Sequence, residues 1–158
     1  MGLPELPSQG ARAVGGAITG ANVKLVFLDF DGVIVTQKTR YMKGDPECIA
    51  ALNRIVETTG AAVVVSSCWR LGMNVVELRE LLRDWGFEGK VIDRTAAMLP
   101  DRGNEIAAWL ESCPRDVERF VILDDDADMV HLKPRLIQTS GDIGLTEDDA
   151  ARAIAMLK

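Results

Sequence analysis

The feature of this sequence that most constrains its fold is the alternation of short apolar runs with longer amphipathic stretches. Five apolar runs have the length of buried strands, at 23–29, 61–66, 90–94, 119–124 and 136–139. Four other stretches repeat apolar residues at helical spacing, at 45–60, 74–86, 104–111 and from 146 onward. Strands that alternate with helices form a parallel sheet covered on both faces. The sequence therefore predicts an α/β fold with a central parallel sheet of about five strands.

Residues with capping propensity mark the helix boundaries in this pattern. Asp45 and Pro46 provide an N-cap and a first-turn proline, and Gly60 ends the same stretch. Asn74 and Glu77 have the spacing of a capping box, in which each side chain accepts a hydrogen bond from the other residue's backbone. These signals predict helices that begin near residues 46 and 75.

Composition and cysteine usage limit the classes of protein that this chain can represent. The 158 residues are 47% hydrophobic and 27% charged, which is typical of a globular protein with a sizeable core. No apolar run is long enough for a membrane span, and we expect no signal peptide. The three cysteines form no CxxC pair, so we expect reduced thiols and a cytoplasmic location. The aperiodic residues 1–22 predict a flexible arm ahead of one domain at 23–158.

The net charge of −6 has a local origin. Eighteen Lys and Arg residues stand against 24 Asp and Glu residues, and six acids in two short clusters account for the difference. These six are Asp29, Asp31, Asp124, Asp125, Asp126 and Asp128. Both clusters follow predicted strands, and α/β proteins bind ligands beyond the carboxyl ends of their strands. The acids therefore indicate a local site, in which a cation would offset their mutual repulsion.

The first acidic cluster is the run Asp29-Phe30-Asp31-Gly32-Val33. Two carboxylates two residues apart after a buried strand are consistent with an Asx-type turn, in which Gly32 supplies a positive φ. They are equally consistent with a nucleophile and an acid/base partner, because a carboxylate can attack phosphorus and form an acyl phosphate. The spacing alone leaves both interpretations open.

The second cluster places four acids within five residues, from Asp124 to Asp128. A solvated acidic loop would explain it, but a divalent cation bound by carboxylate oxygens would relieve the repulsion. Asp124 comes directly off the apolar strand and is the strongest ligand candidate.

Two further signals lie between the acidic clusters. Ser66 and Ser67 follow the second apolar run, where a hydroxyl and backbone N–H groups suit a phosphate oxygen. Arg102 precedes the predicted helix at 104–111, where a cation would neutralise a nucleophile and a phosphate together. Each of these features alone is common on protein surfaces.

Together, and in this order, the signals make the sequence resemble the haloacid dehalogenase (HAD) superfamily of phosphohydrolases. The run from Asp29 to Val33 is similar to its first motif, and Val64-Val65-Ser66 is similar to its second. Arg102 fits the third motif, and Asp124-Asp125 with Asp128 fits the fourth. The resemblance covers residues 23 to about 145 and implies a three-layer, Rossmann-like fold.

The resemblance implies a catalytic role for each acid. Asp29 is the nucleophile, and Asp31 protonates the leaving oxygen and then activates water against the aspartyl-phosphate. Mg²⁺ lies between Asp29, the backbone carbonyl of Asp31, Asp124 and the phosphate, where it offsets the repulsion between carboxylate and anionic ester. Asp125 and Asp128 are further candidates, either as metal ligands or as partners that orient Arg102.

The phosphate ligands that the resemblance implies are Ser66, the backbone at Ser67, and Arg102. The run Ser66-Ser67-Cys68-Trp69-Arg70 carries a narrower similarity, to the phosphatase-like domains of Swiss Army Knife RNA-repair proteins and, more distantly, of polynucleotide kinase-phosphatases. Arg70 would either contact the substrate or structure its own loop. This narrower similarity favours a phosphorylated nucleic-acid end as the substrate.

The spacing between motifs also bears on the substrate. Superfamily members that act on small molecules often carry a cap domain, but only the 14 residues at 32–45 are available at one insertion point. The other insertion point lies between the Ser66 strand and Arg102, and a predicted helix and strand use most of that interval. We therefore expect an uncapped, open site. Such a site suits a 3′- or 5′-phosphorylated nucleic-acid end. Basic and aromatic side chains that could bind such a strand lie in the short segment 32–45. They are Lys38, Arg40, Tyr41 and Lys43. A solvated flap explains them equally well.

Three alternatives are consistent with parts of the pattern. The substrate could be a small phosphomonoester or nucleotide, or a phosphoprotein. A catalytically inactive copy would be a binding module. A two-component receiver domain also combines acids, Ser or Thr and a base on a parallel sheet, but its acidic pair follows the first strand and its phosphoacceptor follows the third. Here the DxD run comes first and the acidic cluster last, which favours the phosphatase.

Overall fold

The computed structural model describes residues 22–66, 72–96 and 101–158. The flexible arm expected at residues 1–22 lies outside these residues apart from Asn22, and so do Ser67 and Arg70. No helix of the described residues is long and apolar enough to cross a membrane.

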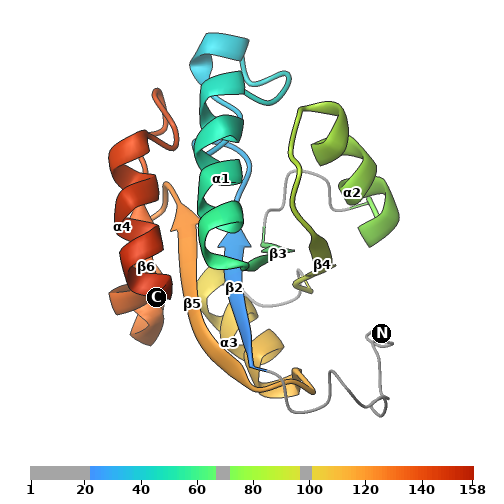
Figure 1. The fold of residues 1–158 in the computed structure, drawn as a ribbon, viewed down its shortest axis with the longest axis vertical. Helices are drawn as coiled ribbons and strands as arrows, with labels where there is room; N and C mark the ends of the chain where they lie inside the picture. Colours follow the sequence, from blue (N-terminus) through green and yellow to red (C-terminus); the bar gives the residue numbers. More distant parts are fainter. Residues whose placement is uncertain (1–21, 67–71, 97–100) are drawn as a thin grey trace.

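A single sheet of five parallel strands organises the fold (Figure 1). The strands are β2 (Val23–Leu28), β3 (Ala62–Val65), β4 (Val91–Arg94), β5 (Val117–Asp124) and β6 (Leu136–Gln138). Their order is β4-β3-β2-β5-β6, and every pairing is parallel. The predicted α/β fold with about five parallel strands is therefore confirmed. The order places β2 at the centre, with β3 on one side and β5 on the other, so three of the predicted motifs share one edge.

Four helices connect or flank the strands: α1 (Pro46–Thr59), α2 (Val75–Asp84), α3 (Arg102–Ser112) and α4 (Glu147–Leu157). Two 3₁₀ segments, η2 (Gln37–Thr39) and η3 (Val130–Arg135), complete the described elements. Asp45 caps α1 by accepting a hydrogen bond from the Glu47 N–H, and Gly60 ends this helix at φ 75°. The capping box of Asn74 and Glu77 is formed at the start of α2. These predicted helix boundaries are confirmed.

The start of α3 differs from the prediction. The helix begins at Arg102, two residues earlier than predicted, with Asp101 at the N-cap. Gly103 is a weak helix former, which is why the sequence pattern favours a start at Asn104. In the structure Gly103 is buried, and a Cβ atom there would overlap the backbone of Met129. The glycine therefore permits close packing of α3 on the loop after β5, and it places Arg102 in the first helical turn.

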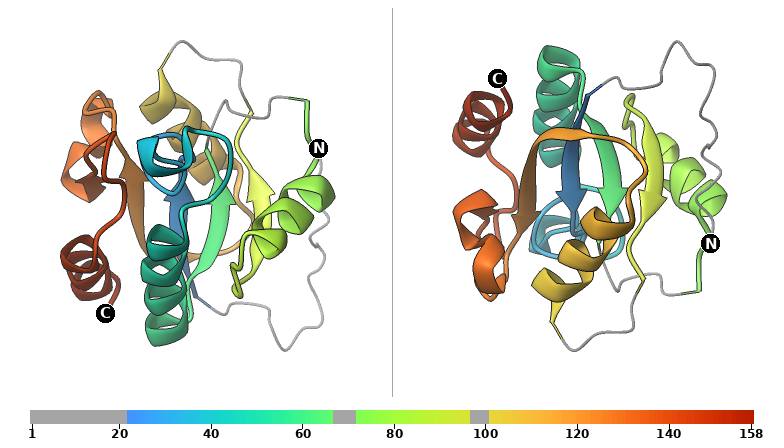
Figure 2. Two further views of the ribbon diagram at one scale, coloured as in Figure 1. Left: turned by 90° about the horizontal axis from the view of Figure 1, so that it is seen from above. Right: turned by 90° about the horizontal axis from the view of Figure 1, so that it is seen from below.

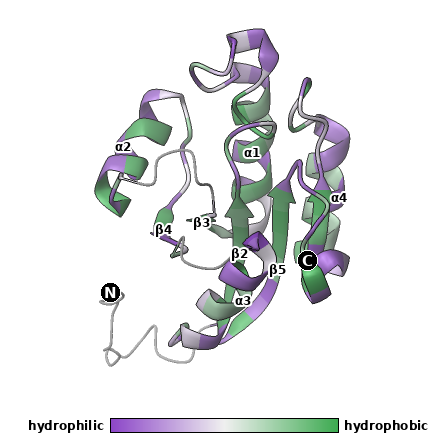
Figure 3. Ribbon diagram, turned by 180° about the vertical axis from the view of Figure 1, so that it is seen from behind, coloured by the Kyte–Doolittle hydropathy of each residue, from purple (hydrophilic) through white to green (hydrophobic). Residues whose placement is uncertain are grey.

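The core has two parts, one on each face of the sheet. Alternate residues of β2 face opposite sides: Val26 and Leu28 pack in one cluster, and Leu25 and Phe27 in the other. Helices α1, α2 and α4 contribute to the first cluster, whereas α3 and η3 contribute to the second. The two views in Figure 2 show α1 and α4 on one side of the sheet and α3 on the other. Strands β2 and β5 are hydrophobic along most of their length (Figure 3), as expected for strands covered on both faces.

The described residues contain no cap domain at either insertion point. Residues 32–45 form a short flap that holds only η2, and α2 and β4 lie in the second interval. The expected uncapped HAD-like architecture therefore agrees with the structure.

Candidate active site

The carboxyl edge of the sheet collects a buried polar residue from every strand. Each of these residues ends its strand or directly follows it, and none is more than 6% exposed. They are Asp29, Ser66, Thr95, Asp124 and Thr139, from β2, β3, β4, β5 and β6 in turn. Burying polar groups costs stability unless they are partnered, so five of them at one edge indicate a functional site.

Three carboxylates form the centre of this edge. One oxygen each from Asp29, Asp124 and Asp125 lies within 4.8 Å of the others. Asp124 is fully buried and Asp29 is 6% exposed, whereas Asp125 is half-buried at the surface of the cluster. The central strands β2 and β5 pair directly, with Leu28 opposite Leu123, and this pairing brings the acids together.

Arg102 supplies a positive charge to these carboxylates. Its Nη1 atom lies 2.6 Å from Oδ2 of Asp124 and 3.2 Å from Oδ1 of Asp29. The guanidinium is largely buried, with 18% of its side chain exposed. The other oxygen of Asp124, Oδ1, accepts a hydrogen bond from the Asp126 N–H at 3.0 Å. The residue predicted for the third motif thus contacts the predicted nucleophile and the predicted metal ligand at once.

Burial and mutual repulsion disfavour the ionised forms of the clustered acids. Burial and, to a smaller degree, the charge of Asp29 raise the pKa of Asp124 to about 6, against the opposing effect of Arg102. Burial and the charge of Asp124 also raise the pKa of Asp125. Among the described residues, Arg102 opposes these effects without cancelling them. A divalent cation would favour the ionised forms of the acids.

The other acids of the two motifs lie at the rim. Asp31 is exposed, two residues beyond Asp29, and its carboxylate is not part of the three-oxygen cluster. Gly32 follows at φ 81°, the positive value expected for this turn, and a Cβ there would overlap the Asp125 carboxylate. Asp128 is exposed and donates its N–H to Oδ1 of Asp126. Asp29 and Asp124 pair with Arg102, and Asp31 is exposed to solvent.

Ser66 lies next to the cluster on the neighbouring strand. The Ser66 N–H donates to the Leu28 carbonyl, one residue before Asp29. Its Oγ atom is buried and has no hydrogen-bond partner among the residues that the structure describes. A buried hydroxyl without a partner is costly, so this oxygen is suited to a ligand. Ser67 and Arg70, the other predicted phosphate contacts on this loop, lie outside the described residues.

The flap contains a polar network that the sequence pattern did not indicate. The Lys38 ammonium lies 2.6 Å from Oε1 of Glu47 and 3.1 Å from Oδ2 of Asp45, and these hydrogen bonds raise its pKa. The buried Thr36 hydroxyl donates to the same Asp45 oxygen at 2.9 Å. Lys38 is half exposed but is held by Asp45 and by Glu47 of α1. Its neighbour Arg40 is also exposed.

The tip of the flap lies against the loop after β6. The Tyr41 hydroxyl donates to the Gly141 carbonyl at 3.2 Å, although the ring remains 41% exposed. Gly141 in turn approaches the Asp125 carboxylate. Arg40, Tyr41 and Lys43 are all exposed. The Tyr41 side chain thus lies on the side of the site where Asp125 is found.

The sequence analysis did not identify two polar residues that follow strands, Thr139 and Thr95, as part of the site. Thr139 donates its hydroxyl to the Gly32 carbonyl at 2.6 Å and its N–H to the Asp124 carbonyl at 3.0 Å. Thr95 follows β4, is 6% exposed, and donates its N–H to the Val65 carbonyl. Threonine is common in strands, so neither residue carried a signal beyond its position after a predicted strand.

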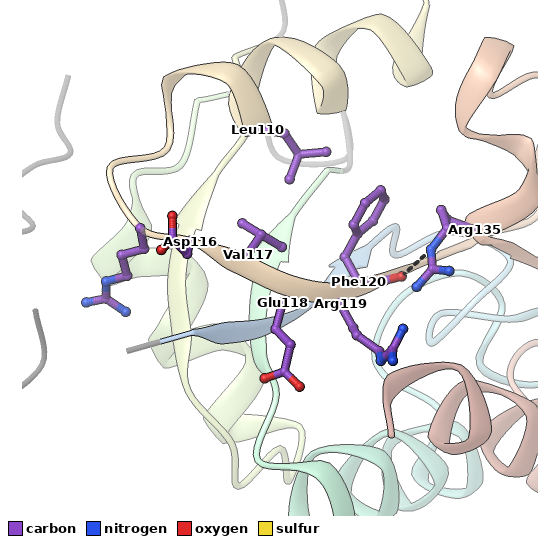
Figure 4. Close-up of a pocket in the computed structure, with 8 residues that line it drawn as sticks. Leu110, Asp116, Val117, Glu118, Arg119, Phe120 and Arg135 are labelled. Atoms are coloured by element: carbon purple, nitrogen blue, oxygen red, sulfur yellow. Dashed lines mark hydrogen bonds between the residues drawn. The ribbon is translucent and has the colours of Figure 1, made fainter. Parts of the chain in front are cut away.

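A separate hollow of about 450 Å³ lies near the amino end of β5 (Figure 4). Its charged lining residues are Arg115, Asp116, Glu118, Arg119 and Arg135. The Arg135 side chain donates to the Phe120 carbonyl at 3.0 Å and stacks on the Phe120 ring. The sequence motifs contribute no residue to this hollow, which lies at the opposite end of β5 from Asp124. The candidate active site is therefore at the carboxyl edge.

Most of the chain matches one known protein family. Residues 25–150 match the family model described as the HAD domain in Swiss Army Knife RNA repair proteins. Neither the curated proteins nor the solved structures contain a match. The matched segment includes the first motif, Ser66, Arg102 and the Asp124–Asp128 cluster, and spans most of the chain. The chain therefore belongs to the family of HAD domains found in Swiss Army Knife RNA repair proteins.

Proposed function

We propose that this protein is a Mg²⁺-dependent phosphomonoester hydrolase that acts through an aspartyl-phosphate intermediate. Membership of the HAD family supports a phosphohydrolase of this type. The observation that carries the finer proposal is the pairing of Arg102 with both Asp29 and Asp124. Ser66 follows the strand next to Asp29, and its buried hydroxyl has no partner within the described part of the chain. Nucleophile, charge neutralisation and phosphate contact are thus available within one small site.

The acids of the site fit a divalent cation. Asp29, Asp124 and Asp125 offer carboxylate oxygens within 4.8 Å of one another, and Mg²⁺ prefers such oxygen ligands. Burial and the neighbouring carboxylates raise the pKa values of Asp124 and Asp125, and a bound cation would offset both effects by favouring the ionised acids. We assign the metal to these three acids, together with the backbone carbonyl of Asp31. When bound, Mg²⁺ would offset the repulsion between the carboxylates and the phosphate ester.

In the first proposed step, a carboxylate oxygen of Asp29 attacks the phosphorus atom. The phosphorus–oxygen bond to the leaving group breaks, and Asp31 gives its proton to the departing oxygen. The buried position of Asp29 leaves the nucleophile few competing contacts with water, whereas the exposed position of Asp31 allows it to reach both leaving group and solvent.

In the second proposed step, Asp31 accepts a proton from a water molecule, which attacks the phosphorus of the aspartyl-phosphate. The bond between the Asp29 oxygen and phosphorus breaks, so inorganic phosphate leaves and Asp29 is regenerated. We assign the remaining phosphate oxygens to the Ser66 hydroxyl and the Arg102 guanidinium, with Ser67 and Arg70 as further contacts. Arg102 would also balance the negative charge that Asp29 regains.

We further propose a phosphorylated nucleic-acid end as the substrate. HAD domains of this family occur in RNA repair proteins. The absence of a cap in the described residues leaves the carboxyl edge open to a large substrate. The flap tip offers Arg40 and Lys43 to a phosphate backbone, and the exposed Tyr41 ring to a base. Lys38 is assigned no substrate contact, because Asp45 and Glu47 hold it.

The proposal is tested with a panel of phosphorylated compounds in the presence of Mg²⁺. The panel contains an aryl phosphate, mononucleotides, 3′- and 5′-phosphorylated oligonucleotides and a phosphopeptide. We expect hydrolysis that requires Mg²⁺ and is lost in excess chelator. The compound hydrolysed with the highest kcat/KM identifies the substrate class, and activity on the phosphopeptide or mononucleotides alone would replace the nucleic-acid proposal.

The mechanism is tested with Asp29→Asn and Asp31→Asn. We expect Asp29→Asn to lower kcat by about 10³-fold or more without unfolding the protein. With an aryl phosphate, whose leaving group needs little protonation, Asp31→Asn should still form the phosphoenzyme but hydrolyse it slowly. A hydroxylamine-sensitive phosphoenzyme that accumulates in Asp31→Asn and is missing in Asp29→Asn is the expected result. Normal turnover by folded Asp29→Asn would exclude the mechanism, and a panel without any substrate would favour a binding module.

A further inference from the structure

The edge strand β6 (Leu136–Gln138) supplies none of the acids of the site, but the residue after it joins two parts of the site. Thr139 is 5% exposed. Its hydroxyl donates to the backbone carbonyl of Gly32 at 2.6 Å, and its N–H donates to the carbonyl of Asp124 at 3.0 Å. One buried residue therefore bonds to the turn after β2 and to the end of β5. These two segments are 107 and 15 residues away from Thr139 in sequence.

A movement of the turn at Gly32 would displace the neighbouring acids Asp31 and Asp125. Gly32 directly follows Asp31, and its Cα packs against the Asp125 carboxylate so closely that a Cβ there would overlap it. The Gly32 N–H donates to the Val35 carbonyl at 2.8 Å, which closes the turn. The hydrogen bond from Thr139 to the Gly32 carbonyl therefore fixes the position of the preceding residue, Asp31. It also limits the position of the Asp125 carboxylate, which packs against Gly32.

We propose that Thr139 is a positioning residue of the active site. Its hydroxyl sets the position of the Asp31–Gly32 turn relative to the Asp124–Asp125 strand end. This inference rests on the proposed function, because it assigns Asp31 to proton transfer and Asp124 and Asp125 to the metal. Without the hydroxyl, the buried Gly32 carbonyl loses its partner and the turn shifts to find another. The contacts assigned to Ser66 and Arg102 are unaffected, because both lie on other elements.

The test compares Thr139→Val, which keeps the shape of the side chain but removes the hydroxyl, with Thr139→Ser, which keeps the hydroxyl. Mg²⁺ affinity is measured by calorimetry without substrate, and kcat and KM are measured with an aryl phosphate. We expect Thr139→Val to weaken Mg²⁺ binding and to lower kcat by about tenfold each. The KM should stay close to the wild-type value, and Thr139→Ser should restore both properties.

Thr59→Val is the matched control. The Thr59 hydroxyl also donates to a backbone carbonyl, that of Ile55 at 2.8 Å, but at the far end of α1. Loss of this bond should lower thermal stability without a change in Mg²⁺ affinity or kcat. If Thr139→Val does not fold, Thr139→Ala takes its place, because it also removes the hydroxyl but brings no second methyl group close to the Gly32 carbonyl, and the same losses are expected.

Two results would overturn the inference. A folded Thr139→Val or Thr139→Ala protein with wild-type Mg²⁺ affinity and kcat would show that the hydroxyl does not position the site. Equal losses in Thr139→Ser would show that packing, and not the hydrogen bond, matters. Failure of the proposed function is distinguishable, because it appears in the wild-type protein as absence of both Mg²⁺ binding and hydrolysis, and it removes this inference as well.

Discussion

The Arg102 guanidinium donates a hydrogen bond to Oδ2 of Asp124 at 2.6 Å, which ties the first turn of α3 to the carboxyl end of β5. Asp124 is fully buried, so its negative charge depends on this partner when no cation is bound. We expect Arg102→Met to lower the free energy of unfolding by about 3 kcal/mol in excess chelator, because it leaves a buried charge unpaired. Mg²⁺ should recover part of this loss by replacing the positive charge. Urea unfolding with chelator and with Mg²⁺ measures both effects.

Arg152→Met is the control for this prediction. Arg152 pairs with Asp149 at 2.8 Å within α4, but its side chain is 60% exposed. Exposed pairs of this kind contribute less than about 1 kcal/mol, and Mg²⁺ should not alter the effect of the change. Equal losses in the two variants, or a loss in Arg102→Met that Mg²⁺ leaves unchanged, would contradict the assignment of Arg102 to the metal-binding acids.

The raised pKa of Asp124 predicts a pH dependence of stability in the metal-free protein. Asp124 titrates near 3.8 in the unfolded chain and at about 6 in the folded protein, mainly because it is buried. The folded state therefore binds the proton more tightly, and the free energy of unfolding falls as the pH rises from about 4 through 6. Asp125 contributes in the same direction. Stabilisation by Mg²⁺, which requires the ionised acids, should grow over the same range.

Unfolding in chelator and in Mg²⁺ at several pH values between roughly 4.5 and 7.5 checks this prediction. Asp124→Asn should flatten most of the dependence. Asp45→Asn is the control: burial raises the pKa of Asp45, but hydrogen bonds from Thr36, Lys38 and the Glu47 N–H outweigh burial and lower it. Its contribution to stability is therefore lost only below about pH 4, and the slope between about pH 4.5 and 6 should persist in this variant. A metal-free protein that gains stability over that range would contradict the prediction.

Alanine variants of two glycines with positive φ distinguish a loss of stability through backbone strain from a loss of Mg²⁺ affinity at the site. Gly32 and Gly60 have φ values of 81° and 75°, which are unfavourable for alanine by about 1–2 kcal/mol. A Cβ at Gly60 would meet no atom within 4 Å, whereas a Cβ at Gly32 would overlap the Asp125 carboxylate. Both alanine variants should lose stability, but only Gly32→Ala should also lose Mg²⁺ affinity. Chemical unfolding and Mg²⁺ calorimetry measure the two effects, and unchanged affinity in Gly32→Ala would separate Asp125 from the metal.

Much of the fold was predictable because local patterns and tertiary burial agree. The apolar run at 23–29 is fully buried from Leu25 onward, and the capping signals of Asp45 and Asn74 are satisfied by the hydrogen bonds they predict. The start of α3 was not predictable, because Gly103 is explained by its contact with Met129, 26 residues away. A packing contact between distant segments leaves no periodic signal in the sequence.

The same limit applies to the site. The acids and Arg102 could be proposed from their positions after strands, and parallel pairing of β2 with β5 brings Asp29 and Asp124 together. Asp45 was assigned only as a helix cap, yet its second oxygen binds Thr36 and Lys38. A carboxylate has two oxygens, and sequence spacing predicts only the bond that one of them makes to the backbone of its own helix. The ion pairs of Lys38 with Asp45 and Glu47 were therefore not predictable from the sequence.

The ion pairs of Lys38 leave Arg40 and Lys43 as the basic residues of the flap that we expect to bind a substrate strand. Arg40 and Lys43 are exposed, whereas Lys38 is held by Asp45 and Glu47. If the flap binds a nucleic-acid strand, interactions beyond the reacting phosphate raise kcat/KM for an oligonucleotide above that for a mononucleotide. We expect a variant with both Arg40→Ala and Lys43→Ala to lose this advantage by about tenfold at low salt, equivalent to ~1.4 kcal/mol. Its activity on the matching nucleoside monophosphate should be unchanged.

Salt dependence distinguishes the two kinds of basic residue in the flap. Removing one cation that binds a backbone phosphate should reduce the slope of log(kcat/KM) against log salt by about 0.7 for a single strand. The Arg40 and Lys43 substitutions should therefore flatten the salt dependence, whereas Lys38→Met should leave its slope unchanged, since that lysine serves Asp45 and Glu47. The measurement compares a 3′-phosphorylated oligonucleotide with its nucleoside monophosphate from low to moderate salt. Equal kcat/KM for the two substrates, without a salt effect in any variant, would exclude strand binding by the flap and leave a small phosphomonoester as the better substrate.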